Sequence, residues 1–515
     1  MIRRACAARF HYPAPGGVVA DFDIAIVGGG INGTGIARDA AGRGLKVLLV
    51  EQNDLASGTS SASSKLIHGG LRYLEHGELR LVHAALRERE VLLRAAPHLI
   101  RPLRFLLPIN AARRSPLLLR FGLLLYDWIG WRAILPGTRK IDLAVDQSGN
   151  PLRHTFQHAY EYSDCFADDS RLVVLNAVDA AERGAAIYTR SHCVRAERAG
   201  EWRLRLDVDG RREEITARAL VNAAGAWVET FADTILRQRG QHHLRLDKGT
   251  HIVVPRLYEH ERAYILQAAD GRVVFAIPFQ DDFTLIGTTD RSFSGDPAVV
   301  TPSPEEIDYL CGVINEYFRT AITDADVVWA FAGVRALYDD GAGKPEDVGR
   351  DYTLMLDQRR GEAPLLTVYG GKITTYRRLA EDALARLADI FPRSPAWTAN
   401  AHLPGGDFAY DGLDALVEKT RHAWPFLTPA HARRLTRTYG TRIGQVLKTA
   451  AGAADLGLNF GADLTEVEVR YLMTKEWAQT ADDVLWRRSK LGLRLSDTQR
   501  IALDRFMKDT AFRVS

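Results

Sequence analysis

The chain has 515 residues, a formal net charge of +3, 46% hydrophobic residues and 25% charged residues. This length predicts about three domains, and the composition is that of a soluble globular protein with a large core. The small net charge gives no indication of nucleic acid as a partner. Four widely separated cysteines without a CxxC pair argue against a disulfide framework and a zinc site, and they indicate a reducing compartment.

Residues 1–20 contain three arginines and no acidic residue. They have no apolar core long enough for a secretory signal, and an organelle transit peptide of this length would be very short. We interpret them as a frayed N-terminal extension. His242 and His243 have no further metal ligand at a suitable spacing, so we interpret them as solvated surface and predict no metal site.

A dinucleotide-binding pattern begins directly after this extension. Residues 22–27 form a short apolar run that predicts a buried parallel strand. Gly28, Gly30 and Gly33 follow in the spacing G-x-G-x-x-G, then come a helical stretch and a second strand that ends at Glu51. Glycines let the backbone approach a pyrophosphate, the helix N-terminus supplies free N–H groups, and the acid binds ribose hydroxyls. At this point NAD and FAD both remain open.

Six further segments form a characteristic set: SSKLIHGGLRYLE (63–75), LVNAAGAW (220–227), GTHIVVPR (249–256), FTLIGTTD (283–290), FAGVRAL (331–337) and VYGGKITTYRRLAE (368–381). Together they closely resemble the FAD-dependent glycerol-3-phosphate dehydrogenases of the aerobic, membrane-associated type. The resemblance is dense over about residues 21–400 and looser beyond them. It therefore implies FAD rather than NAD as the cofactor.

The resemblance implies an α/β fold with a Rossmann-like FAD-binding domain of the glutathione-reductase type. An antiparallel-sheet substrate domain and an α-helical C-terminal domain complete the expected fold. Strand-like runs on either side of Asp270-Gly271 predict a hairpin in the substrate domain. The expected boundaries are 21–95, 160–240 and 328–400 for the FAD domain, 96–159 for an apolar segment near membrane and quinone, 241–327 for the substrate sheet, 403–412 for a linker and 413–515 for the C-terminal domain.

Fourteen residues are expected to hold FAD. They are Gly28, Gly30, Gly33, Glu51, Ser63, Ser64, Lys65, Leu66, Asn222, Ala224, Gly225, Lys372, Ile373 and Thr374. The resemblance implies that the last three approach the pyrimidine end of the flavin through backbone contacts.

Oxidation of a secondary alcohol moves a hydride to the flavin and a proton to a base, and a phosphorylated substrate needs fixed cations. The matched segments supply the predicted catalytic residues His68, Arg335 and Lys372. They also supply the predicted substrate ligands Arg72, Tyr73, Arg335 and Lys372. Taken alone, His68 would be interpreted as a packed loop histidine and Arg335 as a surface ion-pair residue. Which of His68, Arg335 and Lys372 accepts the proton stays open.

Residues 113–132 are the most apolar stretch of the chain, but their uncharged runs are too short to span a bilayer. Composition alone allows a helix in the membrane interface or a buried core helix. The resemblance favours the first, because it implies monotopic attachment to the cytoplasmic side of the cell membrane. It also implies ubiquinone or menaquinone as electron acceptor, and a homodimer.

The main functional hypothesis is thus FAD-dependent oxidation of sn-glycerol 3-phosphate to dihydroxyacetone phosphate, with electrons passed to quinone. One alternative is an oxidase that reduces oxygen, although the resemblance implies an extra insertion for such enzymes, and the chain has no room for one. The other alternative is a non-catalytic flavin-binding membrane or sensor protein, which would not need His68, Arg72, Arg335 and Lys372.

Overall fold

The structure is a computed structural model that describes residues 20–74, 77–110, 115–130, 134–208, 210–238, 244–339, 351–391 and 394–514. The side chains of Arg72, Tyr73 and residues 512–514 are not among those described. Most of the N-terminal extension and the pair His242-His243 also lie outside the described residues. The structure therefore has no bearing on what the sequence predicts for them.

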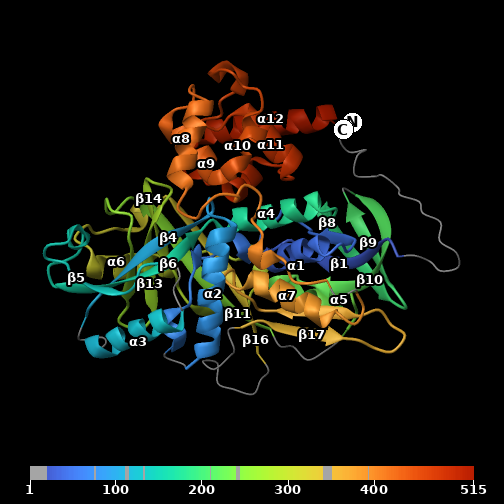
Figure 1. The fold of residues 1–515 in the computed structure, drawn as a ribbon, viewed down its shortest axis with the longest axis horizontal. Coiled ribbons are helices and arrows are strands. Elements are labelled where there is room, and N and C mark those ends of the chain that lie inside the picture. The colour runs from blue at the N-terminus through green and yellow to red at the C-terminus, as the bar shows by residue number, and fades with distance from the viewer. Residues whose placement is uncertain are drawn as a thin grey trace.

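An eight-stranded sheet forms the first layer, in the order β17-β18-β10-β1-β2-β7, with β8 and β9 continuing from β10 (Figure 1). The neighbours from β7 to β18 pair in parallel. Ile24 and Ile26 enter one hydrophobic cluster while Ala25 enters another, because successive side chains of a strand point to opposite faces. The strand bounds are β1 (Phe22–Val27), β2 (Val47–Val50), β7 (Ala186–Tyr188), β8 (Ser191–Arg198), β9 (Trp202–Val208), β10 (Arg211–Asn222), β17 (Thr353–Asp357) and β18 (Leu365–Tyr369).

Three helices cover one face of this sheet: α1 (Ile31–Gly42), α4 (Asp169–Glu182) and α7 (Tyr376–Arg386). On the other face lie the β8–β9 hairpin and the short helix α5 (Val228–Thr234). The parallel strands with helices α1, α4 and α7 on one face form the Rossmann-like domain that the resemblance implies. The predicted fold class is confirmed.

A ten-stranded sheet forms the second layer, in the order β15-β11-β14-β13-β12-β4-β6-β3, with β16 beside β11 and β5 beside β6. All its pairs are antiparallel except β12 with β4. The predicted hairpin is present, and Gly271 takes φ +82° in its turn. The bounds are β3 (Leu66–Ile67), β4 (Ile100–Pro108), β5 (Arg139–Asp142), β6 (His158–Ala167), β11 (Leu244–Pro255), β12 (Ala263–Gln267), β13 (Val273–Phe279), β14 (Phe283–Gly287), β15 (Arg291–Phe293) and β16 (Trp329–Tyr338).

Five strands of the second sheet come from regions that the sequence placed elsewhere. The expected boundaries assign β4 and β5 to the apolar segment, and β3, most of β6 and all of β16 to the FAD domain. In the structure β4 pairs with β6 along its whole length, and β16 pairs with β11. A buried apolar strand fits either sheet by its composition, so only the tertiary pairing decides to which sheet it belongs.

Helix α6 (Pro304–Tyr317) packs on one face of the second sheet, and α2 (Leu79–Ala95) and α3 (Pro116–Ile129) pack on the other. Helix α6 begins with a capping box between Ser303 and Glu306. Figure 1 shows α3 at the lower left edge of the molecule, far from the β8–β10 strands at the right. No helix in the described part of the chain is both long and apolar enough to cross a membrane.

The C-terminal helices form a separate bundle with its own core, which lies above α4 in Figure 1. Its elements are α8 (Leu413–Ala423), α9 (Pro429–Tyr439), α10 (Ile443–Leu447), α11 (Glu466–Lys475), the π-helix η10 (Asp483–Arg488) and α12 (Asp497–Val514). Thr480 and Asp483 cap the start of η10 reciprocally, as their spacing predicts.

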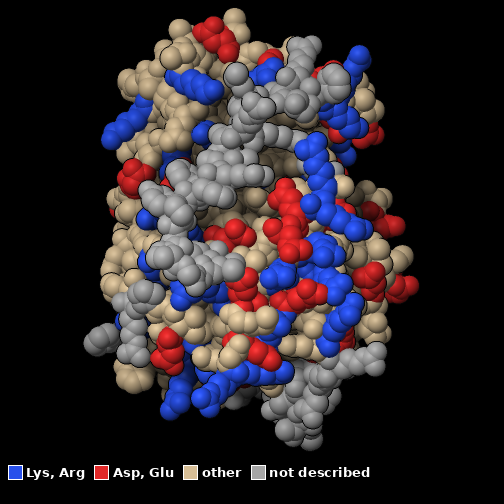
Figure 2. Space-filling view, turned by 90° about the vertical axis from the view of Figure 1, so that its right-hand side faces the viewer, with Lys and Arg blue, Asp and Glu red and all other residues tan. Residues whose placement is uncertain are grey.

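The end of the molecule opposite α3 carries both signs of charge. Figure 2 shows blue and red side chains interspersed over this face rather than gathered by sign. On the β8–β10 strands, for example, Arg203 and Arg205 both lie beside Glu214. Such alternation is in keeping with the small net charge of the chain.

Candidate active site

The glycine loop between β1 and α1 is as tight as its sequence predicts. Gly28 takes φ +116°, and a Cβ there would lie 2.3 Å from the carbonyl oxygen of Ala223. A Cβ on Gly33 would lie 1.9 Å from the carbonyl oxygen of Gly28, and one on Gly30 would lie 3.1 Å from Ser60 Oγ. At Gly28 and Gly33 the neighbouring backbone is so close that no side chain fits. This tight loop leads directly into the N-terminus of α1, where an anionic pyrophosphate would bind.

Glu51 ends β2 directly beside this loop. Its carboxylate accepts hydrogen bonds from the N–H of Gly29 at 2.7 Å and from the N–H of Asn53 at 2.8 Å. Burial raises the pKa of Glu51, and the two backbone donors oppose that effect. A carboxylate has about four acceptor positions, so the two that remain suit ribose hydroxyls.

Two distant segments meet at the N-terminus of α1. The N–H of Ile31 donates to Ser60 Oγ at 3.0 Å, and Asn32 Nδ2 donates to the carbonyl oxygen of Gly370 at 3.0 Å. A Cβ on Gly371, which takes φ +96°, would lie 2.8 Å from Asn32 Nδ2. Asn32 Oδ1 is buried and has no hydrogen-bond partner among the described atoms.

These observations fit a bound flavin nucleotide. The glycine cradle leaves room for a phosphate backbone, and the orphaned Asn32 Oδ1 is an acceptor for a ligand N–H or O–H group. Asn32 was not among the predicted residues, although it stands inside the glycine motif. The carbonyl of Gly370 and the neighbouring backbone of Lys372, Ile373 and Thr374 lie on the segment that approaches it.

Several predicted cofactor residues use their side chains to hold the protein together. Lys65 Nζ lies 2.8 Å from Asp169 Oδ2, and Ser63 Oγ donates to the same oxygen at 2.7 Å. Burial alone would raise the pKa of Asp169, but the charges of Lys65 and Lys490 and the hydrogen bonds from Lys65 and Ser63 together outweigh it, so the pKa is lowered. Leu66 is buried in the core of the second sheet. These residues can therefore offer only backbone groups to FAD.

The turn after β10 is also held together by hydrogen bonds from its own side chains. Asn222 Nδ2 donates to the carbonyl oxygen of Val228 at 2.8 Å, and its Oδ1 accepts from the N–H of Ala224 at 3.3 Å. Gly225 takes φ +59°. The turn lies against Gly28, so Ala224 and Gly225 are near the dinucleotide loop while the Asn222 side chain is turned inward.

His68, Arg335 and Lys372 come together from the loop after β3, from β16 and from the loop after β18. Burial, together with the positive charges of Lys372, Arg89 and Arg335, lowers the pKa of His68 to about 4. Arg335 Nη1 lies 3.1 Å from Asp290 Oδ1, and its side chain is 40% exposed, so its fork remains accessible to a ligand. The main chain of His68 donates to Thr374 Oγ1 at 3.3 Å. The side chains of Arg72 and Tyr73 are outside the described set.

His251 on β11 is a site residue that the sequence prediction missed. Its Nε2 lies 2.9 Å from Ser64 Oγ, and its ring stacks on Phe331 with a centroid separation of 5.0 Å. Its Nδ1 is buried without a partner among the described atoms. Burial, together with the charges of Lys65 and Arg335, lowers its pKa to about 3. A polar residue at the centre of the apolar motif GTHIVVPR was the available signal.

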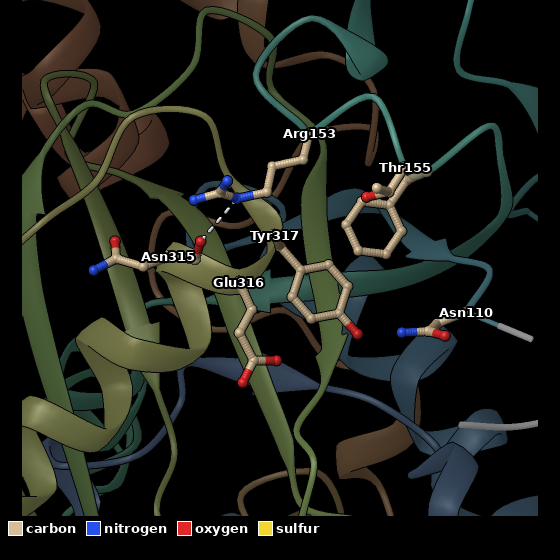
Figure 3. A pocket seen from close by; sticks show the side chains of 7 residues that line it. Asn110, Arg153, Thr155, Asn315, Glu316 and Tyr317 are labelled. Atoms are coloured by element: carbon tan, nitrogen blue, oxygen red, sulfur yellow. Dashed lines mark hydrogen bonds between the residues drawn. The ribbon is translucent and has the colours of Figure 1, made fainter. Parts of the chain in front are cut away.

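A pocket of about 550 Å³ lies between the end of α6 and the segments that follow β4 and precede β6 (Figure 3). Asn110, residues 153–156 in part and the end of α6 line it. Arg153 Nε donates to the carbonyl oxygen of Asn315 at 3.0 Å, and Phe156 stacks on Tyr317 at 4.6 Å. None of the residues predicted for FAD or substrate lines this pocket, so it is separate from the cluster around His68.

Residues 23–377 match the family described as FAD dependent oxidoreductase, and residues 396–510 match the C-terminal domain of alpha-glycerophosphate oxidase. A glycerol-3-phosphate dehydrogenase of Pseudomonas aeruginosa is 53% identical over 95% of both chains. A D-erythritol 1-phosphate dehydrogenase of Brucella abortus is 48% identical over 93% of this chain and 96% of its own. The aerobic glycerol-3-phosphate dehydrogenase of Escherichia coli is 46% identical over 94% and 97%.

A solved structure gives the same picture. The glycerol-3-phosphate dehydrogenase of Bacillus halodurans, which was solved in complex with FAD, superposes with a TM-score of 0.73 at 27% identity. The match covers 96% of this chain and 89% of the other. The family match, the glycine cradle and this neighbour agree on FAD as the cofactor.

Proposed function

The chain belongs to the FAD-dependent glycerol-3-phosphate dehydrogenase family, and on that premise we propose that it oxidises sn-glycerol 3-phosphate at C2 to dihydroxyacetone phosphate. The observation that carries the proposal is the convergence of Arg335, Lys372 and His68 next to the flavin cradle. Clustered cations in a partly buried site are costly unless an anion neutralises them, so they favour a phosphorylated substrate over an amine.

Each side chain has a distinct role in this reaction. FAD, when bound, supplies the acceptor for the hydride that leaves C2. Arg335 and Lys372 bind and orient the phosphate and the reacting oxygen, and Arg72 and Tyr73 complete the phosphate site. The hydroxyl proton goes to an imidazole, because His68 and His251 are neutral at pH 7 whereas a guanidinium stays protonated.

We further propose that electrons leave FAD for a membrane quinone and that α3 attaches the protein to the cytoplasmic membrane surface. One face of α3 packs in the core through Leu119, Leu123 and Tyr126. The exposed side carries five apolar residues that are 52–77% exposed, Leu117, Leu118, Phe121, Leu124 and Trp128, together with the exposed Arg120. An exposed apolar stripe of this size is rare on a soluble monomer and suits the interface of a bilayer.

The Brucella relative motivates a second candidate substrate, a longer polyol phosphate such as D-erythritol 1-phosphate. It carries the same phosphate and the same secondary alcohol chemistry. Comparison of kcat/KM for the two substrates decides between them, because the enzyme discriminates through contacts to the additional hydroxymethyl unit.

One anaerobic experiment tests the proposed reaction. We expect glycerol 3-phosphate to bleach the absorption of the purified yellow protein, and a soluble quinone analogue to restore it faster than oxygen does. Absence of bleaching would refute the dehydrogenase activity and leave a flavin-binding protein. Rapid reoxidation by oxygen with release of peroxide would identify an oxidase.

A further inference from the structure

The C-terminal domain contacts the FAD domain through the π-helix η10 and the residues after it. Arg488 is fully buried, and its two Nη atoms each lie 2.7 Å from a different carboxylate oxygen of Asp54. Asp54 belongs to the loop after Glu51, and Ala56 in this loop donates its N–H to Gly29. π-Helical turns are rare and often mark functional positions. The turn is thus anchored next to the dinucleotide loop.

Lys490 extends from this turn toward the start of α4, which holds the loop with the predicted cofactor residues Ser63, Ser64 and Lys65. Its Nζ donates to Ser170 Oγ at 2.8 Å, and Ser170 directly follows Asp169, whose carboxylate holds Lys65 and Ser63. Burial lowers the pKa of Lys490 to about 8. Burying an ammonium group costs free energy, because the group loses its hydration. The interactions of Lys490 with the groups that it holds in place, such as Ser170, have to offset this cost.

Trp486 connects the same turn to the active site by a different path. Its ring stacks on Trp329 with centroids 4.5 Å apart, and Trp329 contacts Phe331 at 4.5 Å. Phe331 in turn stacks on the imidazole of His251 at 5.0 Å. An unbroken row of rings therefore runs from the C-terminal domain to His251.

We propose that the C-terminal domain orients the imidazole of His251, and that Lys490 and Trp486 are the positioning residues through which it acts. Ser64, in the loop held by Asp169, fixes the direction of the ring through the hydrogen bond to Nε2, and the aromatic row fixes its plane. Both restraints are needed to aim the remaining nitrogen, Nδ1. The inference rests on the proposed function, since that reaction requires an oriented imidazole beside the flavin.

The test compares four variants of the full-length holoenzyme. Lys490→Met removes the ammonium and keeps most of the stem, and Trp486→Ala removes the last ring of the row. Trp486→Phe is the conservative variant that keeps a ring. Arg494→Met is the matched control, because Arg494 Nε also joins the C-terminal domain to the rest of the molecule, 3.1 Å from Asp282, but at an exposed place far from His251 in the contact network.

The measurements are FAD content, kcat and KM with a soluble dye as acceptor, and the visible circular dichroism of the bound flavin. We expect Lys490→Met and Trp486→Ala to lose about 10- to 100-fold in kcat per bound FAD while KM changes little, since small misplacements cost this much. Trp486→Phe and Arg494→Met are expected to stay near the wild type. If these contacts were purely structural, Lys490→Met and Trp486→Ala would instead lower FAD content and stability and leave kcat per bound FAD normal.

Normal kcat per bound FAD in Lys490→Met and Trp486→Ala would overturn the proposal. If one of the two does not fold, the other decides. If glycerol 3-phosphate does not reduce the wild-type flavin, the proposed function fails, and the circular dichroism then decides this inference separately. The inference requires that the circular dichroism spectrum of the flavin changes in Lys490→Met but not in Arg494→Met. Equal spectra of Lys490→Met and the wild type would refute the inference.

Discussion

Burial, together with the positive charges of Lys372, Arg89 and Arg335, lowers the pKa of the His68 imidazole to about 4. The free enzyme therefore holds His68 in the neutral form that can accept a proton. Such an imidazole is a weak base, but a bound phosphate would offset the neighbouring charges and raise its pKa toward the ordinary value of about 6.5. In the proposed reaction, the cations that bind the substrate thus also adjust the pKa of the base when the substrate is present.

The first prediction concerns the pH dependence of flavin reduction at saturating substrate. As pH falls through the pKa of His68 in the complex, which we expect between about 4 and 6.5, the imidazole becomes protonated and the rate declines. Stopped-flow reduction between pH 5 and 8 measures this limb. The phosphate of the substrate also titrates near pH 6, so His68→Asn is the control. If the limb persists unchanged in His68→Asn, His68 is not the titrating group.

The second prediction separates charge from geometry at Arg335. Arg335→Lys keeps the positive charge but loses the planar fork that orients an oxyanion. We expect turnover to fall by about 100-fold or more, as for other oriented electrostatic contacts, while FAD content stays normal. Near-normal turnover with full FAD would place Arg335 outside the pocket.

Single residues also show which parts of the site could be predicted from the sequence. The glycines and Glu51 could be predicted because a pyrophosphate imposes its own spacing on the backbone. The partners of Ser64 and Lys65 could not, since His251 and Asp169 lie over a hundred residues away and only the tertiary fold brings them together. For the same reason a motif suggests that Lys65 touches the cofactor, whereas its ammonium is bound to Asp169.

At the scale of elements, α3 has both a buried side and exposed apolar side chains, so a place in the core and the proposed interfacial contact are compatible on one helix. Leucines occur on both faces, so apolar residues alone do not mark in the sequence which side is buried and which is exposed. The structure assigns Leu119 and Leu123 to the core and Leu118, Phe121 and Trp128 to the surface. The flanking arginines 113, 114 and 132 are outside the described residues.

The third prediction uses this division. Replacing Leu118, Phe121 and Trp128 with serine should move the protein from the liposome pellet to the supernatant. The rate of quinone reduction should then fall, while the flavin still reduces a soluble dye. Each lost side chain removes several buried methylene groups at about 0.8 kcal/mol apiece. The matched control, Leu119→Ser with Leu123→Ser, should instead lower stability and FAD content, because it cuts into the core. Unchanged liposome binding with a smaller oligomer would identify the face as a contact between copies of the chain.

At the scale of the whole molecule, the C-terminal domain is held to the other two by buried contacts rather than by its linker. Arg171 on α4 pairs with Glu476 inside this interface, and His98 lies beside it against Gly405 and Gly440. The helical character of the domain could be predicted from the resemblance and from the capping residues Thr480 and Asp483. Its docking could not, because the buried ion pairs join residues that have no local relation in the sequence.

The last prediction concerns the acid stability of this interface. Burial and the charge of Arg171 lower the pKa of His98 to about 3, below the value of about 6.5 in the unfolded chain. Its contribution to stability is therefore complete above pH 6.5 and is lost as pH falls from 6.5 toward 3. At pH 5 the loss amounts to about 2 kcal/mol. Urea unfolding at pH 7.5 and pH 5.0 should show this loss in the wild type, and in His422→Asn, which alters an exposed histidine on α8. In His98→Asn the difference between the two pH values should shrink by about the same 2 kcal/mol, whatever the variant costs at pH 7.5, because asparagine cannot take up the proton. An equal pH difference in His98→Asn and the wild type would show that His98 is not the group whose protonation loosens the C-terminal domain.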